Sequence, residues 1–398
     1  MEILISGAGV AGPVLAYWLR RHGMTPVVVE RTPSPRIGLG GHAVDLFAPA
    51  MEVAARMALD GVLRQSRTEL DALALVRRGK LPVELAFDAL APAFADDRHV
   101  EILRGELVTT LHAATRGDVE YHFGDSVRSL REDSGGCHVT FESGTTRRFD
   151  LVVGADGLHS TVRRLTFGDE KEMVHHLGGY LAVFSVPGDL ALPRRTAVYN
   201  GVNRIAVVYP VKQTGLARAV LVFRKPGQEH DIHRDIAAQQ RFVRREYAGE
   251  GWRVPVLLDA MENADDFYFD SLSQVRLGSW SRGRVTLVGD AGFAPGPAVG
   301  GGTTLAFVSA YVLAHALAEA QGDHAAAFSA YESRMHDYVR TCREAAQRAM
   351  RRAIPSSWAH KAASTTALRL LPRLPRPLHR RLLAGGVSNA LSSFTLPG

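Results

Sequence analysis

Three glycines near the N-terminus stand where a backbone can approach an anion. The stretch ILISGAGVAGPVLAYWLRRHG places an apolar run before Gly7, Gly9 and Gly12 and a run with helical spacing after them. Gly7 permits a tight turn, Gly9 lets backbone N–H groups approach a pyrophosphate, and Gly12 allows a helix to pack closely on a strand. The positive end of the helix dipole then points at the phosphates. The pattern predicts a phosphate-binding turn between a strand and a helix.

An acidic residue completes this motif as a dinucleotide site. Glu30 ends the apolar run PVVVE, 18 residues after Gly12. A carboxylate at this position accepts hydrogen bonds from the ribose hydroxyls of an adenosine and repels a 2′-phosphate. The first 30 residues are therefore predicted to bind a dinucleotide, and these residues alone leave both NAD and FAD open.

Two later stretches also have an apolar strand that runs into a polar turn. In VVGADGLHSTVRR, Asp156 and Gly157 follow a strand, although an N-cap role would also account for Asp156. In RVTLVGDAGFAPGPAVGGGTTLAF, Gly289 and Asp290 end a strand, and the glycines at 300–302 open a long helix. Successive glycine N–H groups at a helix N-terminus suit an electron-rich carbonyl or an anionic ring nitrogen. Asp290 can accept a hydrogen bond from a ribityl hydroxyl.

Together the three motifs resemble, in order and spacing, the fingerprints of the FAD-dependent aromatic hydroxylases, the class A flavoprotein monooxygenases with the para-hydroxybenzoate hydroxylase fold. The stretch ERTPSPRIGLGGHAVDL looks most like the tetracycline-inactivating monooxygenases and related polyketide-modifying enzymes. The resemblance implies FAD as cofactor and NADPH or NADH as electron donor. It also implies transfer of one oxygen atom from O₂, through a flavin C4a-hydroperoxide, to an aromatic or polyketide-like small molecule. No catalytic side chain and no metal are implied, because the flavin carries the chemistry.

The same resemblance assigns cofactor-binding roles to individual positions. The pyrophosphate turn is implied to comprise Gly7, Gly9, Ala11 and Gly12, with Glu30 on the adenosine ribose and Arg31 beside the adenine. The remaining implied contacts are Arg36 for NADPH, Asp45 near the flavin, Arg104 for the ribityl and pyrophosphate region, Asp156 and Gly157 for both FAD and NAD(P)H, Gly289 and Asp290 for the ribityl chain or pyrophosphate, and Pro297, Gly300, Gly301 and Gly302 beside the isoalloxazine.

The chain departs from the family pattern at two places. Gly292-Phe293 follows Ala291 where the family usually has Ala-His or Ala-Tyr, and Ser309-Ala310 replaces an Asp-Ala pair. Neither change removes a phosphate or ribityl contact, so FAD binding is still expected.

The elements that must position these residues indicate an α/β fold. We expect a Rossmann-like, GR2-type FAD-binding domain, an inserted and mostly antiparallel β-sheet substrate domain, and C-terminal helices. A hairpin near 70–87 and alternation over 119–149 and 180–224 predict antiparallel strands. The predicted parts are 1–70, 101–176 and 273–325 for FAD binding, 71–100 for a substrate-domain hairpin, 177–272 for the substrate domain and 326–398 for the C-terminal helices.

The inserted sheet is expected to supply the substrate face. Polar and apolar residues alternate along its strands, but alternation does not show which face meets the flavin. The histidines His42, His175 and His176 have no metal-ligand spacing and are interpreted as structural. The candidates for substrate contact are Tyr199, Arg204, Tyr209, Arg224 and Phe293.

Composition limits the other classes of function. The chain has 398 residues, 46% of them hydrophobic, and can bury a sizeable core. Cys137 and Cys342 are its only cysteines, which predicts a reducing, cytoplasmic location. No apolar run of membrane-spanning length is evident, so no membrane span is expected. Nine Lys or Arg residues follow the last acidic residue, Glu344, and the stretch ALRLLPRLPRPLHRRLLAGG has no interleaved aromatics. This tail predicts a solvated basic face and no nucleic-acid partner, and we expect a monomer or weak dimer.

Two alternatives remain open from the sequence. One is a non-catalytic protein that binds and sequesters a flavin or another small molecule. The other is a flavin-dependent halogenase or reductase of the same fold. The halogenase motif W-x-W-x-I-P is absent because the four tryptophans stand apart. Reduction of a bound flavin by NAD(P)H would exclude the sequestration protein.

Overall fold

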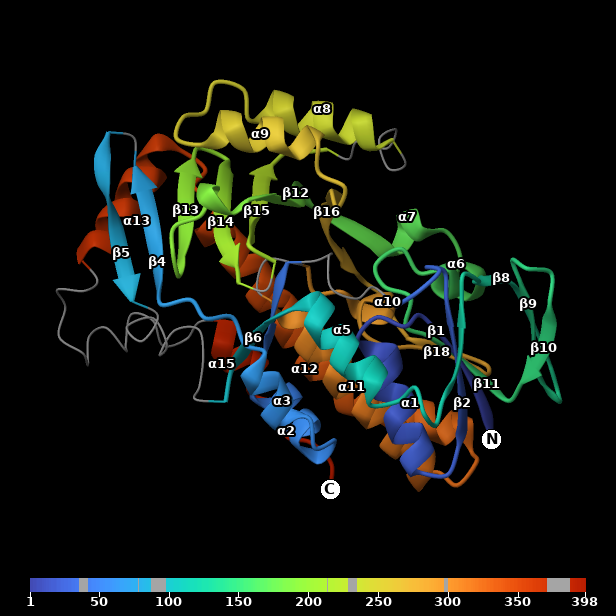
Figure 1. Ribbon diagram of the computed structural model, residues 1–398. Helices are drawn as coiled ribbons and strands as arrows, with labels where there is room; N and C mark the ends of the chain where they lie inside the picture. The colour runs from blue at the N-terminus through green and yellow to red at the C-terminus, as the bar shows by residue number, and fades with distance from the viewer. Residues whose placement is uncertain are drawn as a thin grey trace.

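The computed structural model describes residues 1–35, 42–77, 79–86, 98–212, 214–227, 235–296, 300–370 and 387–398. Two positions with implied cofactor roles, Arg36 and Pro297, lie outside the described residues. The described part confirms the predicted fold class: a mainly parallel sheet, a second and largely antiparallel sheet, and C-terminal helices (Figure 1).

The first sheet joins segments that are far apart in the sequence. Its strand order is β17-β18-β11-β1-β2-β7, in which β1 pairs in parallel with β11 and β2, and β11 with β18. The central strands are buried on both faces, which accounts for their unbroken apolar runs. The bounds are β1 Glu2–Ser6, β2 Thr25–Glu30, β7 Glu120–Phe123, β11 Leu151–Gly154, β17 Ser281–Arg282 and β18 Val285–Leu287.

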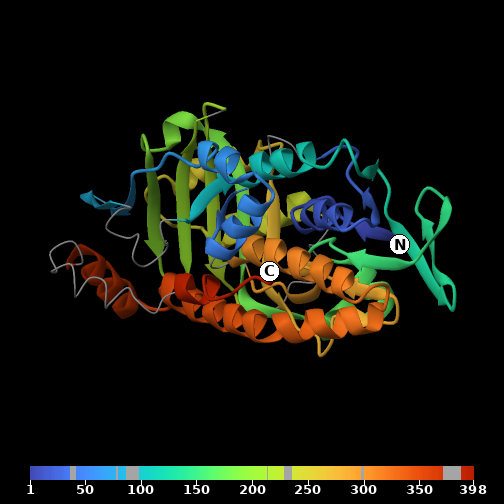
Figure 2. The ribbon, with the colours of Figure 1, turned by 90° about the horizontal axis from the view of Figure 1, so that it is seen from below.

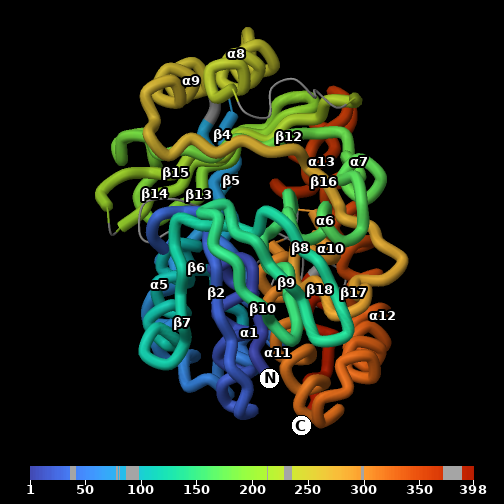
Figure 3. Tube along the Cα trace, turned by 90° about the vertical axis from the view of Figure 1, so that its right-hand side faces the viewer, coloured from blue at the N-terminus to red at the C-terminus, as the bar shows by residue number. Residues whose placement is uncertain are grey.

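Helices and a small sheet cover this first sheet. Helix α1 packs on β1 and β2 and contacts α11, whereas β9 and β10 contact β11 and β1 (Figure 3). The expectation of antiparallel strands throughout 119–149 was wrong at its start, because β7 pairs in parallel with β2. The bounds are α1 Ala11–Arg21, α11 Gly301–Glu319, α12 His324–Ala353, β8 Val127–Asp133, β9 Gly136–Phe141 and β10 Thr146–Phe149.

The second sheet has seven strands in the order β16-β12-β15-β14-β13-β4-β5. The predicted hairpin is confirmed as β4 and β5, and β4 joins the sheet in parallel with β13. One face packs under α8 and α9, seen above the sheet in Figure 1. The bounds are β4 Ala72–Arg77, β5 Lys80–Ala86, β12 Val174–Pro187, β13 Arg195–Gly201, β14 Arg204–Val211, β15 Leu216–Arg224, β16 Tyr268–Val275, α8 Ile236–Glu246 and α9 Val254–Glu262.

The structure shows which face of the second sheet points inward. Along β12, Tyr180, Ala182 and Phe184 lie in the core beneath α8 and α9. The alternate residues Leu181 and Val183 pack toward the end of α12 and line the cavity described below. The first sheet and the inward face of the second therefore enclose the site.

Short elements complete the described chain, and α11 runs through its core. Helix α11 is long and apolar enough to cross a membrane, but 78% of its most apolar window is buried, as in a core helix. The remaining bounds are β3 Ala43–Leu46, α2 Ala48–Arg56, α3 Asp60–Gln65, β6 Val100–Leu103, α5 Arg104–Ala113, α6 Thr161–Phe167, α7 Glu170–Met173, the 3₁₀ turn Gly188–Leu190, α10 Asp290–Phe293, α13 Trp358–Leu370 and α15 Val387–Leu391.

Candidate functional site

A cavity of about 1970 Å³ lies between the two sheets. It meets the carboxyl ends of β1, β2 and β11, which is where parallel α/β sheets bind ligands. The predicted cofactor residues that line it are Gly7, Gly9, Ala11, Glu30, Arg31, Asp45, Arg104, Asp156, Gly157, Asp290, Gly300 and Gly302. Three further predicted residues, Gly12, Gly289 and Gly301, do not line it.

The three N-terminal glycines have distinct structural roles. Gly7 has a φ of +113°, and a Cβ there would lie 2.5 Å from the carbonyl oxygen of Ala155. A Cβ on Gly12 would lie 2.0 Å from the carbonyl oxygen of Gly7. A Cβ on Gly9 would meet no atom nearer than the Arg104 Nη2, at 3.9 Å, so this glycine faces the cavity. Among the described residues no side chain caps the start of α1, so its N–H groups are available to an anion.

Glu30 is held at the end of β2 with its carboxylate in the cavity. One oxygen accepts a hydrogen bond from the Ala8 N–H at 2.9 Å, and the other from the Thr32 N–H at 3.1 Å and its hydroxyl at 3.0 Å. These bonds tie the glycine turn to β2. The carboxylate oxygens retain lone pairs that can accept hydrogen bonds from ribose hydroxyls.

Arg104 and Asp290 place opposite charges on the cavity wall. The Arg104 backbone N–H donates to His42 O at 3.2 Å, and no described residue accepts a hydrogen bond from its guanidinium. Burial raises the pKa of Asp290, with Arg104 acting in the opposite direction and Asp270 adding to the rise. Burial and Arg104 lower the pKa of His42 to about 4, so this imidazole is neutral at pH 7. A free guanidinium beside Gly9 and a free helix N-terminus fit the pyrophosphate of FAD.

The three glycines at the start of α11 face different neighbours. Gly300 has a φ of +66°, and a Cβ there would lie 1.9 Å from Asp45 Oδ2. A Cβ on Gly302 would lie 3.3 Å from Asp290 Oδ1. Asp45 is oriented by His99, whose Nε2 lies 2.8 Å from Asp45 Oδ1. Gly300 and Gly302 therefore present bare backbone to the cavity between two carboxylates.

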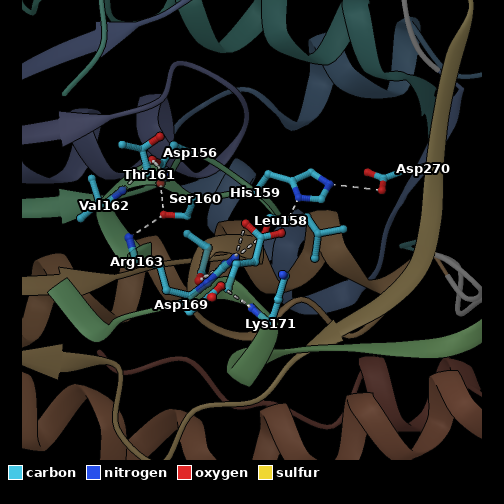
Figure 4. Close-up of polar contacts among 12 residues, drawn as sticks. Asp156, Leu158, His159, Ser160, Thr161, Val162, Arg163, Asp169, Lys171 and Asp270 are labelled. Atoms are coloured by element: carbon cyan, nitrogen blue, oxygen red, sulfur yellow. Dashed lines mark hydrogen bonds and ion pairs between the residues drawn. The ribbon is translucent and has the colours of Figure 1, made fainter. Parts of the chain in front are cut away.

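The carboxylate of Asp156 is occupied by the start of α6. It accepts hydrogen bonds from the N–H groups of Thr161, at 2.8 Å, and Val162, at 3.1 Å, and from the Ser160 hydroxyl (Figure 4). Burial raises its pKa, opposed by these bonds. Asp156 thus anchors the start of α6 without being its N-cap, which is Ser160, while it and Gly157 also line the cavity.

A buried arginine links the second and third motifs. The side chain of Arg163 is fully buried and donates to Leu158 O at 2.6 Å and to Ala291 O at 2.9 Å. The two turns that carry Asp156 and Asp290 are therefore fixed relative to each other. No local pattern could predict this role, because the contact spans 128 positions.

The five residues predicted to contact substrate lie outside the cavity lining. Each is engaged elsewhere. The Tyr199 hydroxyl bonds to Glu250 at 2.7 Å, Arg204 pairs with the same carboxylate at 3.4 Å, and Phe293 is buried against Trp280.

Tyr209 and Arg224 are likewise held by the backbone. The Tyr209 hydroxyl accepts a hydrogen bond from the Ala43 N–H at 2.8 Å. The guanidinium of Arg224 donates to Met350 O, Arg351 O and Ile354 O at the end of α12. The polar side chains predicted from these strands therefore have structural partners. The wall of the cavity is formed instead by other residues of the inserted domain, which are Leu181, Val183, Asn200, Asp265, Asp266, Phe267, Tyr268, Phe269, Asp270, Ser271 and Ser273.

An ion-pair cluster that sequence reasoning missed joins the two sheets at the cavity. His159, after β11, lies between Glu170 Oε1 at 2.6 Å and Asp270 Oδ1 of β16 at 3.3 Å (Figure 4). The Tyr268 hydroxyl donates to the other Asp270 oxygen at 2.7 Å. Hydrogen bonds and the charges of both carboxylates raise the pKa of His159 to about 10. At neutral pH, therefore, an imidazolium bridges the two parts of the molecule.

This bridge makes stability depend on pH in a defined direction. The pKa of His159 rises from 6.5 to about 10 on folding, so its stabilisation is complete below pH 6.5 and is lost as pH rises through about 10. We expect His159→Gln to lower the melting temperature by about 2 °C at pH 7, since a half-exposed pair is screened by solvent. The difference in melting temperature between His159→Gln and the unsubstituted protein should vanish above about pH 10.5. His138→Gln, which breaks a pair within one hairpin, is the matched control. A difference that persists at high pH would contradict the bridge.

Comparisons with known proteins agree with this site. The FAD binding domain family matches residues 1–353. A flavin-dependent monooxygenase of Legionella longbeachae is 37% identical over 340 residues, 85% of this chain and 86% of the relative. The chain belongs to the FAD-dependent monooxygenases.

Two further proteins resemble this chain over 85% or more of its length. The crystal structure of the tetracycline destructase Tet(55) superimposes with a TM-score of 0.84 at 32% identity and covers 100% of this chain and 98% of that one. An uncharacterized protein of Mycobacterium tuberculosis is 41% identical over 342 residues, 85% of this chain and 90% of the relative. The predicted family is therefore confirmed.

Proposed function

We propose that this monooxygenase uses NADPH or NADH to transfer one oxygen atom from O₂ to an aromatic or polyketide-like small molecule. The observation that carries the proposal is the division of one cavity into two unlike halves. One half holds the glycine turn, Arg104 and Asp290, and the other holds the inward face of the second sheet. The cavity exceeds the roughly 300–1,000 Å³ typical of a pocket for one small ligand, which leaves room for a substrate beside FAD. The similarity to a tetracycline destructase supports the polyketide-like class.

The chain's own residues bind and orient in this proposal. FAD, when bound, supplies the redox and oxygen chemistry. The free N-terminus of α1 and the Arg104 guanidinium bind the pyrophosphate, Glu30 accepts from the adenosine ribose, and Asp290 accepts from the ribityl chain. Leu181 and Val183 on the inward face give the substrate half apolar surface that excludes water, beside the polar side chains of Asn200, Ser271 and Ser273.

The end of α12 adds positive charge to the substrate half. Ala345, Arg348, Ala349, Arg352 and Ala353 recur at helical spacing and line the cavity together. The alanines leave space there, and Arg348 is only loosely paired with Glu344, at 3.4 Å. Asp265, Asp266 and Asp270 also line the cavity, so the positive charge is local to the end of α12. We therefore propose that substrates place an acidic group, either a carboxylate or an ionised phenol or enol, against this helix end.

This charge preference can be measured with model ligands. We expect Arg352→Ala to weaken binding of 2-naphthoate roughly tenfold, the size of one charge-assisted hydrogen bond, and to leave binding of neutral 2-naphthamide unchanged. The change in the flavin absorbance band during a titration measures the binding of either ligand. Arg351→Ala is the matched control, because Arg351 neighbours Arg352 on α12 but does not line the cavity. Equal losses of affinity for 2-naphthoate and 2-naphthamide would contradict the proposed preference for acidic substrates.

The proposed reaction has a direct test in the visible spectrum of the FAD-loaded protein. Anaerobic NADPH, and separately NADH, should bleach the flavin band, which should return with air. A bound flavin that neither nucleotide reduces would favour a sequestration protein instead. We also propose that the protein acts in the cytoplasm as a monomer or weak dimer. The free, buried thiols of Cys137 and Cys342 support a reducing compartment.

A further inference from the structure

The first turn of α11 has one face that points away from the cavity. Gly300 and Gly302 line the cavity, but Gly301 between them does not. A Cβ on Gly301 would lie 2.6 Å from Leu391 Cδ2, and its three nearest atoms all belong to Leu391. The glycine at 301 thus lets a side chain from the C-terminal segment press directly on the backbone of this turn.

The C-terminal segment is firmly attached where it makes this contact. Leu391 is fully buried, and its carbonyl oxygen accepts a hydrogen bond from the Tyr338 hydroxyl at 2.6 Å. The ring of Phe394 packs on Tyr338, with centroids 4.8 Å apart. Further on, Pro397 O accepts hydrogen bonds from Arg56 at 2.7 Å and from the Tyr311 hydroxyl at 3.1 Å. Figure 2 shows the segment lying across α11 and α12.

The same segment also reaches the cavity. Ser388 is buried, with 8% of its surface exposed, and it lines the cavity. It lies one helical turn before Leu391 on α15, so one short helix both presses on Gly301 and forms part of the wall. Helix α15 lies beyond residue 353, where the match to the FAD binding domain family ends.

We propose that residues 387–397 form a brace that holds the first turn of α11 in the shape that binds FAD, with Leu391 as the positioning residue. No described side chain caps this turn, so its N–H groups can serve a ligand only if the backbone is held in place from behind. Leu391 provides that support through Gly301. The inference rests on FAD binding in the cavity, which is part of the proposed function.

The test compares FAD affinity with stability in full-length variants. We expect Leu391→Ala to raise the Kd of FAD for the apoprotein roughly tenfold, and Leu391→Met to restore most of the affinity. Leu257→Ala is the matched control, because Leu257 is equally buried but lies on α9, which covers the face of the second sheet that points away from the cavity. It should lower the melting temperature of the apoprotein similarly without changing the Kd. If Leu257→Ala weakens FAD binding as much as Leu391→Ala, the brace is overturned.

A double substitution tests the contact itself. Gly301→Ala should clash with Leu391 and raise the Kd of FAD, whereas Gly301→Ala combined with Leu391→Ala should bind FAD more tightly than Gly301→Ala alone. If the Kd of the double variant is raised by the product of the increases seen in the two single variants, Leu391 does not act through Gly301. If the unsubstituted protein binds no FAD, the proposed function fails, and with it the premise of the brace. If that protein binds FAD and the Leu391 variant binds equally well, only the brace fails.

Discussion

Replacing Gly9 with alanine is expected to remove FAD from a protein that still folds. A Cβ at this position meets only the end of the flexible Arg104 side chain, at 3.9 Å, so the apoprotein accommodates it. The methyl group projects into the space that a pyrophosphate must approach. Loss of two charge-assisted hydrogen bonds would weaken binding by about 3 kcal/mol, roughly a hundredfold in Kd. Fluorescence titration of the apoprotein with FAD measures this loss.

Gly12→Ala is the informative comparison for Gly9→Ala. Its Cβ would lie 2.0 Å from the carbonyl oxygen of Gly7, and backbone cannot move aside as a side chain can. The apoprotein itself should then lose stability, by about 3 kcal/mol if the strain resembles strong overpacking. Melting of the two apoproteins separates the cases, with Gly9→Ala unchanged and Gly12→Ala lowered. Two equally destabilised variants would show that Gly9 is required for folding and would remove the argument for a ligand at the turn.

These glycines could be identified from sequence because their constraints are local. A tight turn, a strand before it and a helix after it all lie within some twenty residues, and Glu30 closes the same unit. Asp290 was found in the same way, since it lies three residues after the end of a buried strand. Where a function depends on a backbone shape, the residues that permit that shape are legible in order along the chain.

The substrate wall could not be predicted in this way. Alternation places Arg204 and Tyr209 on opposite faces of β14, and neither lines the cavity. Tyr209 does point inward but bonds to the backbone of Ala43, a residue 166 positions away. His159 and Asp270 meet across a similar separation. Partners so distant are brought together by the packing of two sheets, which no local pattern encodes.

The two residues that depart from the family pattern, Ser309 and Phe293, both have defined contacts within the core. The Ser309 hydroxyl accepts a hydrogen bond from the Gly289 N–H at 3.2 Å and donates to Ala306 O at 3.3 Å. This residue therefore still supports the turn before Asp290. Phe293 is fully buried against Trp280 and lies away from the cavity. Both changes are accommodated behind the site, which is consistent with retained FAD binding.

Asp290→Ala should weaken FAD binding, whereas His175→Ala should not. The Asp290 carboxylate lies on the cavity wall beside Gly302, where no described residue donates a hydrogen bond to its oxygens, so they can accept one from the ribityl chain. Losing one bond to a charged acceptor costs about 1.5–3 kcal/mol, which is roughly ten- to a hundredfold in Kd. His175 is exposed on β12 outside the cavity lining and serves as the control. Equal FAD retention in the variants and the unsubstituted protein would count against this site.

The pH dependence of FAD binding gives the Asp290 prediction a second measurement. Burial raises the pKa of this carboxyl above its ordinary value of 3.8. The charged acceptor is therefore lost as pH falls, starting at a higher pH than for an exposed aspartate. The Kd of FAD should rise on acidification in the unsubstituted protein, and this rise should be smaller in Asp290→Asn, which cannot titrate. Because protonation of Asp290 removes charge without removing the side chain, the same acid-dependent rise in both proteins would assign the effect to another group and leave Asp290 as a neutral part of the wall.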